Sequence, residues 1–103
     1  MRIITGILKG RRLNPTENLP VRPTTDMARE GLFNILNNIL DYEELSVLDL
    51  FSGTGAVSFE FISRGVREVT AIEINSKCTD FIKKSAQQFG VNKYFSLHQC
   101  ILY

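Results

Sequence analysis

The sequence predicts an α/β fold in which parallel strands form a sheet with helices packed against it. Three observations lead to this prediction: short and nearly continuous apolar runs, helical periodicity between them, and a glycine-rich turn directly after the first run. Short apolar runs are typical of strands buried on both faces of a parallel sheet. Strands that alternate with helices indicate such a sheet, with right-handed connections. The 103 residues predict one domain, 1–103.

The first element that we expect is a basic arm with its loop, residues 1–23. Short apolar pieces alternate with Gly6 and Gly10 between residues 2 and 13, which favours a small β-hairpin. Four cations and no acid lie in the first twelve residues: Arg2, Lys9, Arg11 and Arg12. Clustered cations can contact nucleic-acid phosphates, although a solvated surface arm is the simpler alternative. Three prolines predict a loop after the hairpin.

Helices and strands alternate through the remaining segment, residues 24–103. Thr24, Thr25 and Asp26 offer side-chain oxygens that can cap a helix over about 26–40, in which apolar residues recur at helical spacing. The further elements that we expect are a strand at 46–51, a turn at 52–55, a helix at 56–64, a strand at 68–74, a helix from Asn75 or Ser76 to Gly90, and a strand at 94–98.

The composition excludes several other classes of protein. Hydrophobic residues make up 44% and charged residues 22%, as in ordinary soluble domains. No apolar run reaches the roughly 18–20 residues of a membrane span, and the N-terminus lacks a signal-peptide pattern. Cys78, Cys100 and the single histidine, His98, are too few for a four-ligand zinc site. We therefore expect a cytoplasmic protein with reduced thiols, no membrane association and no metal.

The glycine turn is the strongest functional signal. Asp49 and the turn Ser52–Gly55 lie at the end of the first buried strand, where ligands bind in parallel α/β sheets. Gly53 and Gly55 let a ligand approach the main chain, and the N–H groups that begin the next helix favour an anion. A glycine pair alone also occurs in many plain loops. Its place between a strand and a helix predicts a nucleotide-like ligand.

Two carboxylates distinguish between cofactors. Glu73 ends the next strand, where a carboxylate can accept hydrogen bonds from both ribose hydroxyls, although a surface acid is the simpler alternative. A dinucleotide turn has a third glycine or an alanine, but here Ser58 takes that position. Asp49 would be unfavourable beside a pyrophosphate and favourable beside an ammonium and a sulfonium. These features disfavour a nicotinamide-dependent oxidoreductase.

The segment Val47–Ala56, VLDLFSGTGA, resembles motif I of class I S-adenosylmethionine-dependent methyltransferases. Four further segments are similar to the RsmD-type family: RIITG at 2–6, KGRRL at 9–13, RPTTD at 22–26 and FNIL at 33–36. The resemblance runs from residue 1 to about residue 98. It implies a Rossmann-like class I methyltransferase sheet. It also implies methylation of the exocyclic N2 of a guanine in 16S ribosomal RNA, free or in a small ribosomal subunit particle.

The resemblance also assigns roles to individual residues. With S-adenosylmethionine as cofactor, Asp49, Gly53 and Gly55 would hold its methionine end, and Glu73 its ribose. The full set of expected cofactor-binding residues is Asp49, Phe51, Ser52, Gly53, Thr54, Gly55, Glu73, Ile74, Arg22, Thr24 and Thr25. RNA phosphates would be met by Lys9, Arg11 and Arg12. For the two threonines, capping of the helix is the alternative role.

The sequence departs from the family pattern in two places. The family has an aspartate after its third strand for the adenine amino group, where this chain reads His98-Gln99-Cys100. The Asp-Pro-Pro-Tyr motif, which positions the target amine, does not occur in the 103 residues. We therefore expect a truncated, cofactor-binding half of a methyltransferase domain, inactive by itself and without a catalytic residue. The alternative is a non-catalytic nucleotide- or RNA-binding module.

The missing strand partner leads to a last expectation. In the family's strand order, 3-2-1-4-5-7-6, the first strand is central. In this chain the strand at 46–51 would therefore be an exposed apolar edge, which favours pairing with another chain. We expect a possible homodimer through that edge.

Overall fold

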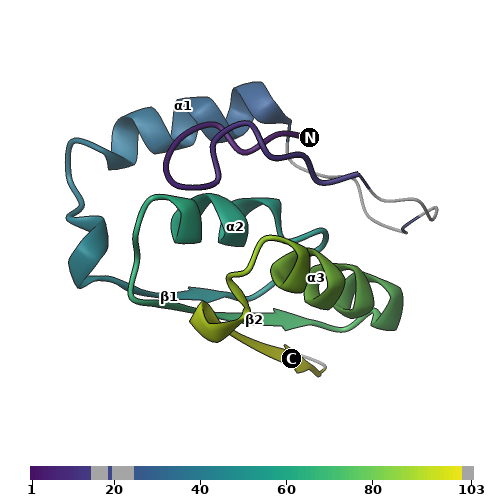
Figure 1. Ribbon diagram of the computed structural model, residues 1–103. Coiled ribbons are helices and arrows are strands. Elements are labelled where there is room, and N and C mark those ends of the chain that lie inside the picture. Colours follow the sequence, from purple (N-terminus) through teal and green to yellow (C-terminus); the bar gives the residue numbers. More distant parts are fainter. Residues whose placement is uncertain (15–18, 20–24, 101–103) are drawn as a thin grey trace.

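The computed structural model describes residues 1–14, 19 and 25–100, and it contains the alternation that the sequence predicts. Figure 1 shows the elements in their order along the chain. They are α1 (Asp26–Leu36), the 3₁₀ turn η1 (Tyr42–Glu44), β1 (Ser46–Asp49), α2 (Ala56–Ser63), β2 (Glu68–Glu73), α3 (Ser76–Gln88), the 3₁₀ turn η2 (Asn92–Tyr94) and β3 (Phe95–Gln99).

The sheet has the order β1-β2-β3, and both neighbouring pairs are parallel. Val47 lies opposite Val69, and Val69 lies opposite Phe95. The α/β prediction is therefore confirmed. Because the strands run in one direction, their carboxyl ends meet at one end of the molecule, beside the chain's N-terminus (Figure 1).

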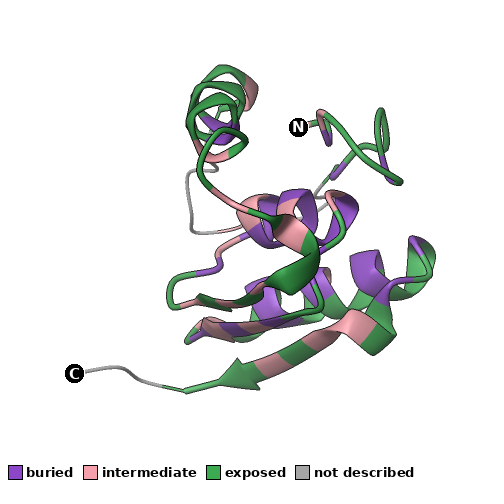
Figure 2. Cartoon of the chain, turned by 90° about the vertical axis from the view of Figure 1, so that its left-hand side faces the viewer, coloured by how far each residue is buried: buried purple, intermediate pink, exposed green. Residues whose placement is uncertain are grey.

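The helices form layers on one side of the sheet. Figure 1 shows α2 and α3 against the sheet, with the N-terminal arm and α1 stacked beyond α2. Phe59 of α2 is fully buried at the centre, where its ring packs edge-to-face on Phe89 and Phe95. Buried residues concentrate in α2 and in the parts of the sheet and α3 next to it (Figure 2). This apolar layer holds the carboxyl ends of β1 and β2 in place below α2.

The helix α1 differs from the sequence prediction in its length and in its buried side. It ends at Leu36, not near residue 40, and a turn follows in which Leu40 N–H still donates to Leu36 O. Most of the apolar stripe is exposed: Met27, Leu32, Ile35 and Ile39. The buried residues of α1 are instead Arg29 and Phe33. The helix contacts the rest of the chain through the Phe33 ring, which packs on Phe61.

The N-terminal arm, here the described residues 1–14, is a compact antiparallel loop and not the regular β-hairpin that we expected. Its only β-bridge within the described residues joins Arg2 to Arg12, and Ile3 N–H donates to Arg11 O at 2.9 Å. The turn between them bends through Gly6 and Gly10, both with positive φ. The loop follows the surface of α2 with its backbone, which prevents longer strand pairing.

The far face of the sheet carries no helix within the described residues (Figure 1). Leu48 points to that side, since alternate residues of a strand face opposite sides and Val47 and Asp49 face α2. The exposed apolar side chains continue through Leu50 and Phe51. β1 pairs only with β2, so its second edge is free of strand partners in the described part of the chain. No described helix is both long and apolar enough to span a bilayer.

Candidate functional site

The glycine turn links β1 to α2 at the carboxyl end of the sheet. Gly53 and Gly55 have φ of 56° and 83°, which other residues rarely adopt, and Gly55 N–H donates to Ser52 O at 2.8 Å. A Cβ at Gly55 would lie 3.0 Å from the Phe59 ring and 3.1 Å from Ile82. The turn therefore needs glycine at position 55 for its torsion and for its close packing on the core.

Ser52 fastens the turn to both neighbouring strands. Its N–H donates to Ile72 O at 3.1 Å, and its hydroxyl lies 3.2 Å from the carbonyl oxygens of Ile72 and Asp49. Backbone carbonyls at strand ends would otherwise lack partners. Ser52 is buried, so in this structure it holds the turn in place through these hydrogen bonds.

Glu73, at the end of β2, spans from the turn to the start of α3. Its Oε1 accepts a hydrogen bond from Gly53 N–H and its Oε2 accepts one from Asn75 N–H, both at 2.8 Å. A carboxylate has about four lone-pair positions, so each oxygen keeps capacity for one further donor. Glu73 is only 8% exposed, so a ligand can reach its carboxylate only from directly above the turn.

Glu73 also affects the thiol at the start of α3. Burial raises the pKa of Cys78, and the negative charge of Glu73 raises it further. A raised pKa keeps the thiol protonated, and therefore poorly nucleophilic, at neutral pH.

Asp49, at the end of β1, is held by Ser58, which was not among the expected cofactor-binding residues. Ser58 of α2 donates its hydroxyl to Asp49 Oδ2 at 2.6 Å. Ser58 is the residue at the position where a dinucleotide turn has glycine or alanine, so the substitution supplies a hydrogen bond that orients the carboxylate. Asp49 is half-buried and lies on the α2 side of β1, beneath the turn.

The remaining turn residues lie around these two carboxylates. Thr54 is buried, and its hydroxyl lies 3.6 Å from Met1 Sδ, so the first residue of the arm covers the turn. Phe51 and Ile74 follow β1 and β2 and are exposed, Phe51 by 81%. They stand at the two strand ends that also carry Asp49 and Glu73, and they offer apolar surface to a ligand.

The expected contribution of the Arg22–Asp26 segment is largely outside the described residues, where Arg22 and Thr24 fall. Thr25 is described, and its hydroxyl accepts a hydrogen bond from Ala28 N–H at 3.1 Å. This is the capping role that the sequence left open. Asp26 joins the arm by accepting a hydrogen bond from Arg2 N–H. Burial raises the pKa of Asp26, but the hydrogen bonds from Arg2 and Arg29 and the positive charges of Arg29 and the N-terminus together lower it below its ordinary value.

The three expected RNA-binding residues all lie in the N-terminal arm, but they have different neighbours. Lys9, Arg11 and Arg12 are all exposed. The Arg11 guanidinium lies over the Phe89 ring, 5.3 Å from its centre, at the end of α3. The positive charge of the arm therefore reaches the end of α3. The backbone of Arg12 forms the β-bridge with Arg2, close to the N-terminus.

The end of β3 carries Gln99, which the sequence did not single out. Its amide donates to Ile74 O at 3.2 Å and its oxygen lies 3.4 Å from the Thr79 hydroxyl. The signal was present in the sequence: Gln99 belongs to the triplet that replaces the family's aspartate. Here its side chain fixes the backbone at Ile74.

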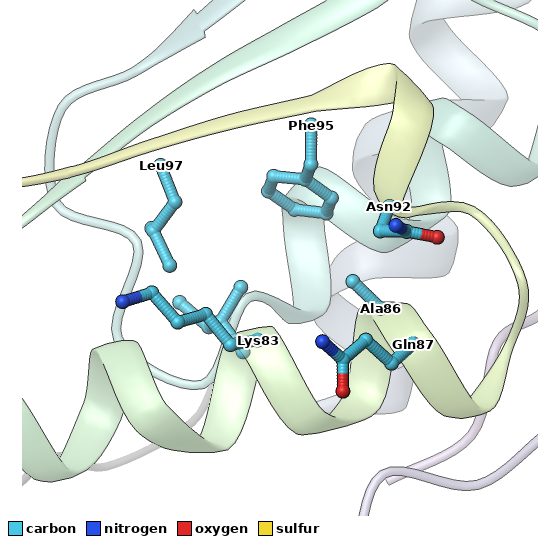
Figure 3. Close-up of a pocket in the computed structure, with 7 residues that line it drawn as sticks. Lys83, Ala86, Gln87, Asn92, Phe95 and Leu97 are labelled. Atoms are coloured by element: carbon cyan, nitrogen blue, oxygen red, sulfur yellow. The ribbon is translucent and has the colours of Figure 1, made fainter.

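A hollow of about 230 Å³ lies elsewhere, between α3 and β3 (Figure 3). Phe95, Leu97 and Lys83 point toward one another across it, with Ala86, Gln87 and Asn92 at the other end. None of the expected cofactor-binding residues lines it. It lies along the outer strand and not at the carboxyl edge, so it is separate from the candidate site.

Comparison with known proteins identifies the family. A family described as "Conserved hypothetical protein 95" matches residues 1–101. The chain belongs to this family, the RsmD-type methyltransferases. The resemblance stated from the arm, the Arg-Pro-Thr-Thr-Asp segment and motif I is therefore confirmed.

Both the sequence comparison and the structure comparison find methyltransferases that are similar to this chain. "Ribosomal RNA small subunit methyltransferase D" of Haemophilus influenzae is 37% identical over 87 residues, 84% of this chain and 44% of the relative. The protein of that name in Escherichia coli strain K12 is 40% identical over 75 residues, 73% of this chain and 37% of the relative. The solved yhhF structure from Escherichia coli has a TM-score of 0.83 and 32% identity, over 97% of this chain and 52% of that chain. The chain thus spans about half the length of the proteins it matches.

Proposed function

We propose that this chain is the cofactor-binding part of an S-adenosylmethionine-dependent RNA methyltransferase. The observation that carries the proposal is the arrangement at the carboxyl edge. Asp49 and Glu73 flank a glycine turn, and Gly53 N–H ties that turn to Glu73. Relatives named as ribosomal RNA methyltransferases support the same class of reaction.

The residues present fit this cofactor. Glu73 retains lone pairs for two ribose hydroxyls, and Asp49, oriented by Ser58, supplies a negative charge for the ammonium group. Gly53, which is only partly buried, lets the methionine end approach the main chain of the turn, while Phe51 and Ile74 offer apolar surface. Gly55 is buried against Phe59 and Ile82 and sets the shape of the turn. When bound, S-adenosylmethionine supplies an electrophilic methyl group. The chain's own residues bind and orient it.

The finer assignment concerns the substrate. We propose 16S ribosomal RNA, or a small ribosomal subunit particle, with the exocyclic N2 of a guanine as methyl acceptor, in the cytoplasm. Lys9, Arg11 and Arg12 support an RNA substrate, because exposed cations on one arm can neutralise neighbouring phosphates.

The 103-residue chain by itself is expected to transfer no methyl group. Its sequence has no Asp-Pro-Pro-Tyr segment to place a target amine in line with the sulfonium, and positioning supplies several kcal/mol of barrier reduction. Transfer of tritiated methyl groups to small-subunit RNA and to particles is the measurement, with full-length methyltransferase D as positive control. Counts above background from this chain would show that the proposed division of roles is wrong.

The isolated chain is expected to form a two-fold dimer through the free edge of β1. Leu48, Leu50 and Phe51 are exposed by 59%, 43% and 81%, and Asp49 is the only charge among them, which is weak protection for a strand edge. Pairing β1 with its copy would cover the free edge and place the Leu48 side chains of the two copies next to each other on one sheet face. Light scattering at several concentrations is the test, with Leu48→Lys as the variant that should shift the chain toward monomer. A parent chain that stays monomeric at all concentrations would contradict this expectation.

A further inference from the structure

The N-terminal arm is held on α2 by two buried side chains that take no part in the cofactor site. Glu60 and Ser63 lie one helical turn apart, exposed by 0% and 2%. Burying a carboxylate is costly unless hydrogen bonds satisfy it. The partners of Glu60 therefore show what this position of α2 is built to bind.

Glu60 binds two consecutive backbone N–H groups of the arm. Ile4 N–H donates to Oε1 at 2.9 Å, and Thr5 N–H donates to Oε2 at 3.2 Å. Arg64 balances the charge from the next turn of the helix, with its Nε 3.0 Å from Oε2. Both oxygens are thus engaged, and two of the three bonds hold the arm.

Ser63 holds the residues that follow. Its hydroxyl accepts from Leu8 N–H at 2.9 Å and donates to Thr5 O, and its carbonyl oxygen accepts from Ile7 N–H at 2.9 Å. Gly6 fits directly against this residue, because a Cβ there would lie 1.8 Å from Ser63 O. These contacts permit one register of the arm on α2, and they give a physical reason for Gly6 in the segment that marked the family.

The docked arm connects the two ends of α2. The helix begins directly after the cofactor turn at Gly55 and ends at the arm's anchor, Ser63. The arm runs along it, so that Met1 covers Thr54 and Leu8 lies at Ser63. The chain then turns back, which brings Arg11 opposite Ile3 with its guanidinium over the Phe89 ring. Cations on a docked backbone lose less conformational freedom when they bind phosphates than cations on a free tail.

We propose that Glu60 and Ser63 are positioning residues that fix the basic arm relative to the cofactor turn and thereby raise the affinity of the chain for RNA. This inference rests on the proposed function, because it needs the arm to contact RNA. Neither side chain touches the RNA or the cofactor in this proposal. Both act through the backbone of residues 4–8.

The test compares Glu60→Gln and Ser63→Ala with the parent chain. The glutamine NH₂ would face a backbone N–H donor, so at least one arm contact is lost. We expect amide exchange at Ile4 and Thr5 to become at least about tenfold faster, and affinity for a fluorescein-labelled hairpin of small-subunit ribosomal RNA to fall about tenfold. Calorimetric affinity for S-adenosylmethionine should not change. Glu43→Gln, on the exposed turn η1, is the matched control for the lost charge.

A double-mutant cycle separates positioning from general loss of structure. In a chain with Lys9, Arg11 and Arg12 changed to alanine, Glu60→Gln should cause no further loss of RNA affinity, since the arm then lacks the three cations that are proposed to contact phosphates. Equal additional losses in both backgrounds would overturn the inference. A variant whose arm is undocked but which binds RNA as tightly as the parent chain would also overturn the inference.

The two proposals fail in different ways. A parent chain that binds no RNA overturns the RNA part of the proposed function, and this inference with it. A parent that binds RNA while Glu60→Gln and Ser63→Ala leave affinity unchanged overturns the inference alone. Should Glu60→Gln unfold, Ser63→Ala removes only a hydroxyl and allows the same comparison.

Discussion

Glu73→Ala is expected to lower the affinity for S-adenosylmethionine by roughly 10- to 150-fold, because a hydrogen bond to a charged group contributes about 1.5–3 kcal/mol. The substitution removes the carboxylate proposed for the ribose and also the acceptor of Gly53 N–H, so the turn loses one of its links to β2 and keeps those of Ser52 to Ile72 O. Calorimetric titration of the chain measures the effect. Glu68→Ala, at the exposed start of the same strand, is the control and should bind as the parent does.

Glu73→Gln separates the two contributions to that loss. The amide keeps one acceptor for a backbone N–H but places a donor where Asn75 N–H or Gly53 N–H now donates. Affinity should fall between that of the parent and that of the alanine variant, while urea unfolding reports any change in stability. Unchanged affinity in Glu73→Ala, with the fold intact, would show that the ribose assignment is wrong.

Gly6→Ala is expected to detach the arm and to lower the free energy of unfolding by more than about 2 kcal/mol. The new Cβ would lie 1.8 Å from Ser63 O, and the positive φ of 96° adds backbone strain. Relief requires the arm to move away from α2, which exposes the buried side chains of Ile3, Leu8 and Leu13. Urea unfolding followed by circular dichroism is the measurement.

Gly10→Ala is the matched control in the same arm. Gly10 has a similar φ of 83°, but a Cβ there would meet nothing within 4 Å. Its cost should therefore be that of the torsion alone, about 1–2 kcal/mol. Equal destabilisation by the two substitutions would show that contact with Ser63 does not hold the arm in place.

Local patterns were sufficient to predict the elements that form the site. The apolar run before Ser52, the glycines of the turn and the acid at the end of the second run each act over a few residues, and the structure brings them to one edge of the sheet as expected. The parallel direction of the strands follows from alternation, because parallel strands must be joined by crossovers, whereas their order was expected from the family resemblance and agrees with the order β1-β2-β3. The boundaries shifted by one or two residues where strand pairing ends, as at Asp49.

Contacts between distant parts of the chain could not be predicted in this way. Glu60 resembles any helical surface acid until its partners, Ile4 N–H and Thr5 N–H, are known, and these are more than 50 positions away. The apolar stripe of α1 suggested a buried face, but only Phe33 finds a ring to pack on within the described residues. Burial of polar groups depends on such partners, and a sequence period does not contain them.

The role of Ser58 shows a third limit. The sequence identified it as a departure from the dinucleotide pattern, and the absence of glycine carried the argument. The structure adds the positive contribution, since the Ser58 hydroxyl orients Asp49. The sequence pattern shows only that glycine or alanine is missing at position 58, and it does not indicate what the serine does there.

Titration of the chain with S-adenosylmethionine and, separately, with NAD tests the central claim most directly. The Asp49 carboxylate at the end of β1, oriented by Ser58, and the free lone pairs of Glu73 predict saturable binding of S-adenosylmethionine that Asp49→Ala weakens, with no binding of NAD. Binding of NAD alone, or binding of S-adenosylmethionine that neither Asp49→Ala nor Glu73→Ala affects, would contradict the account.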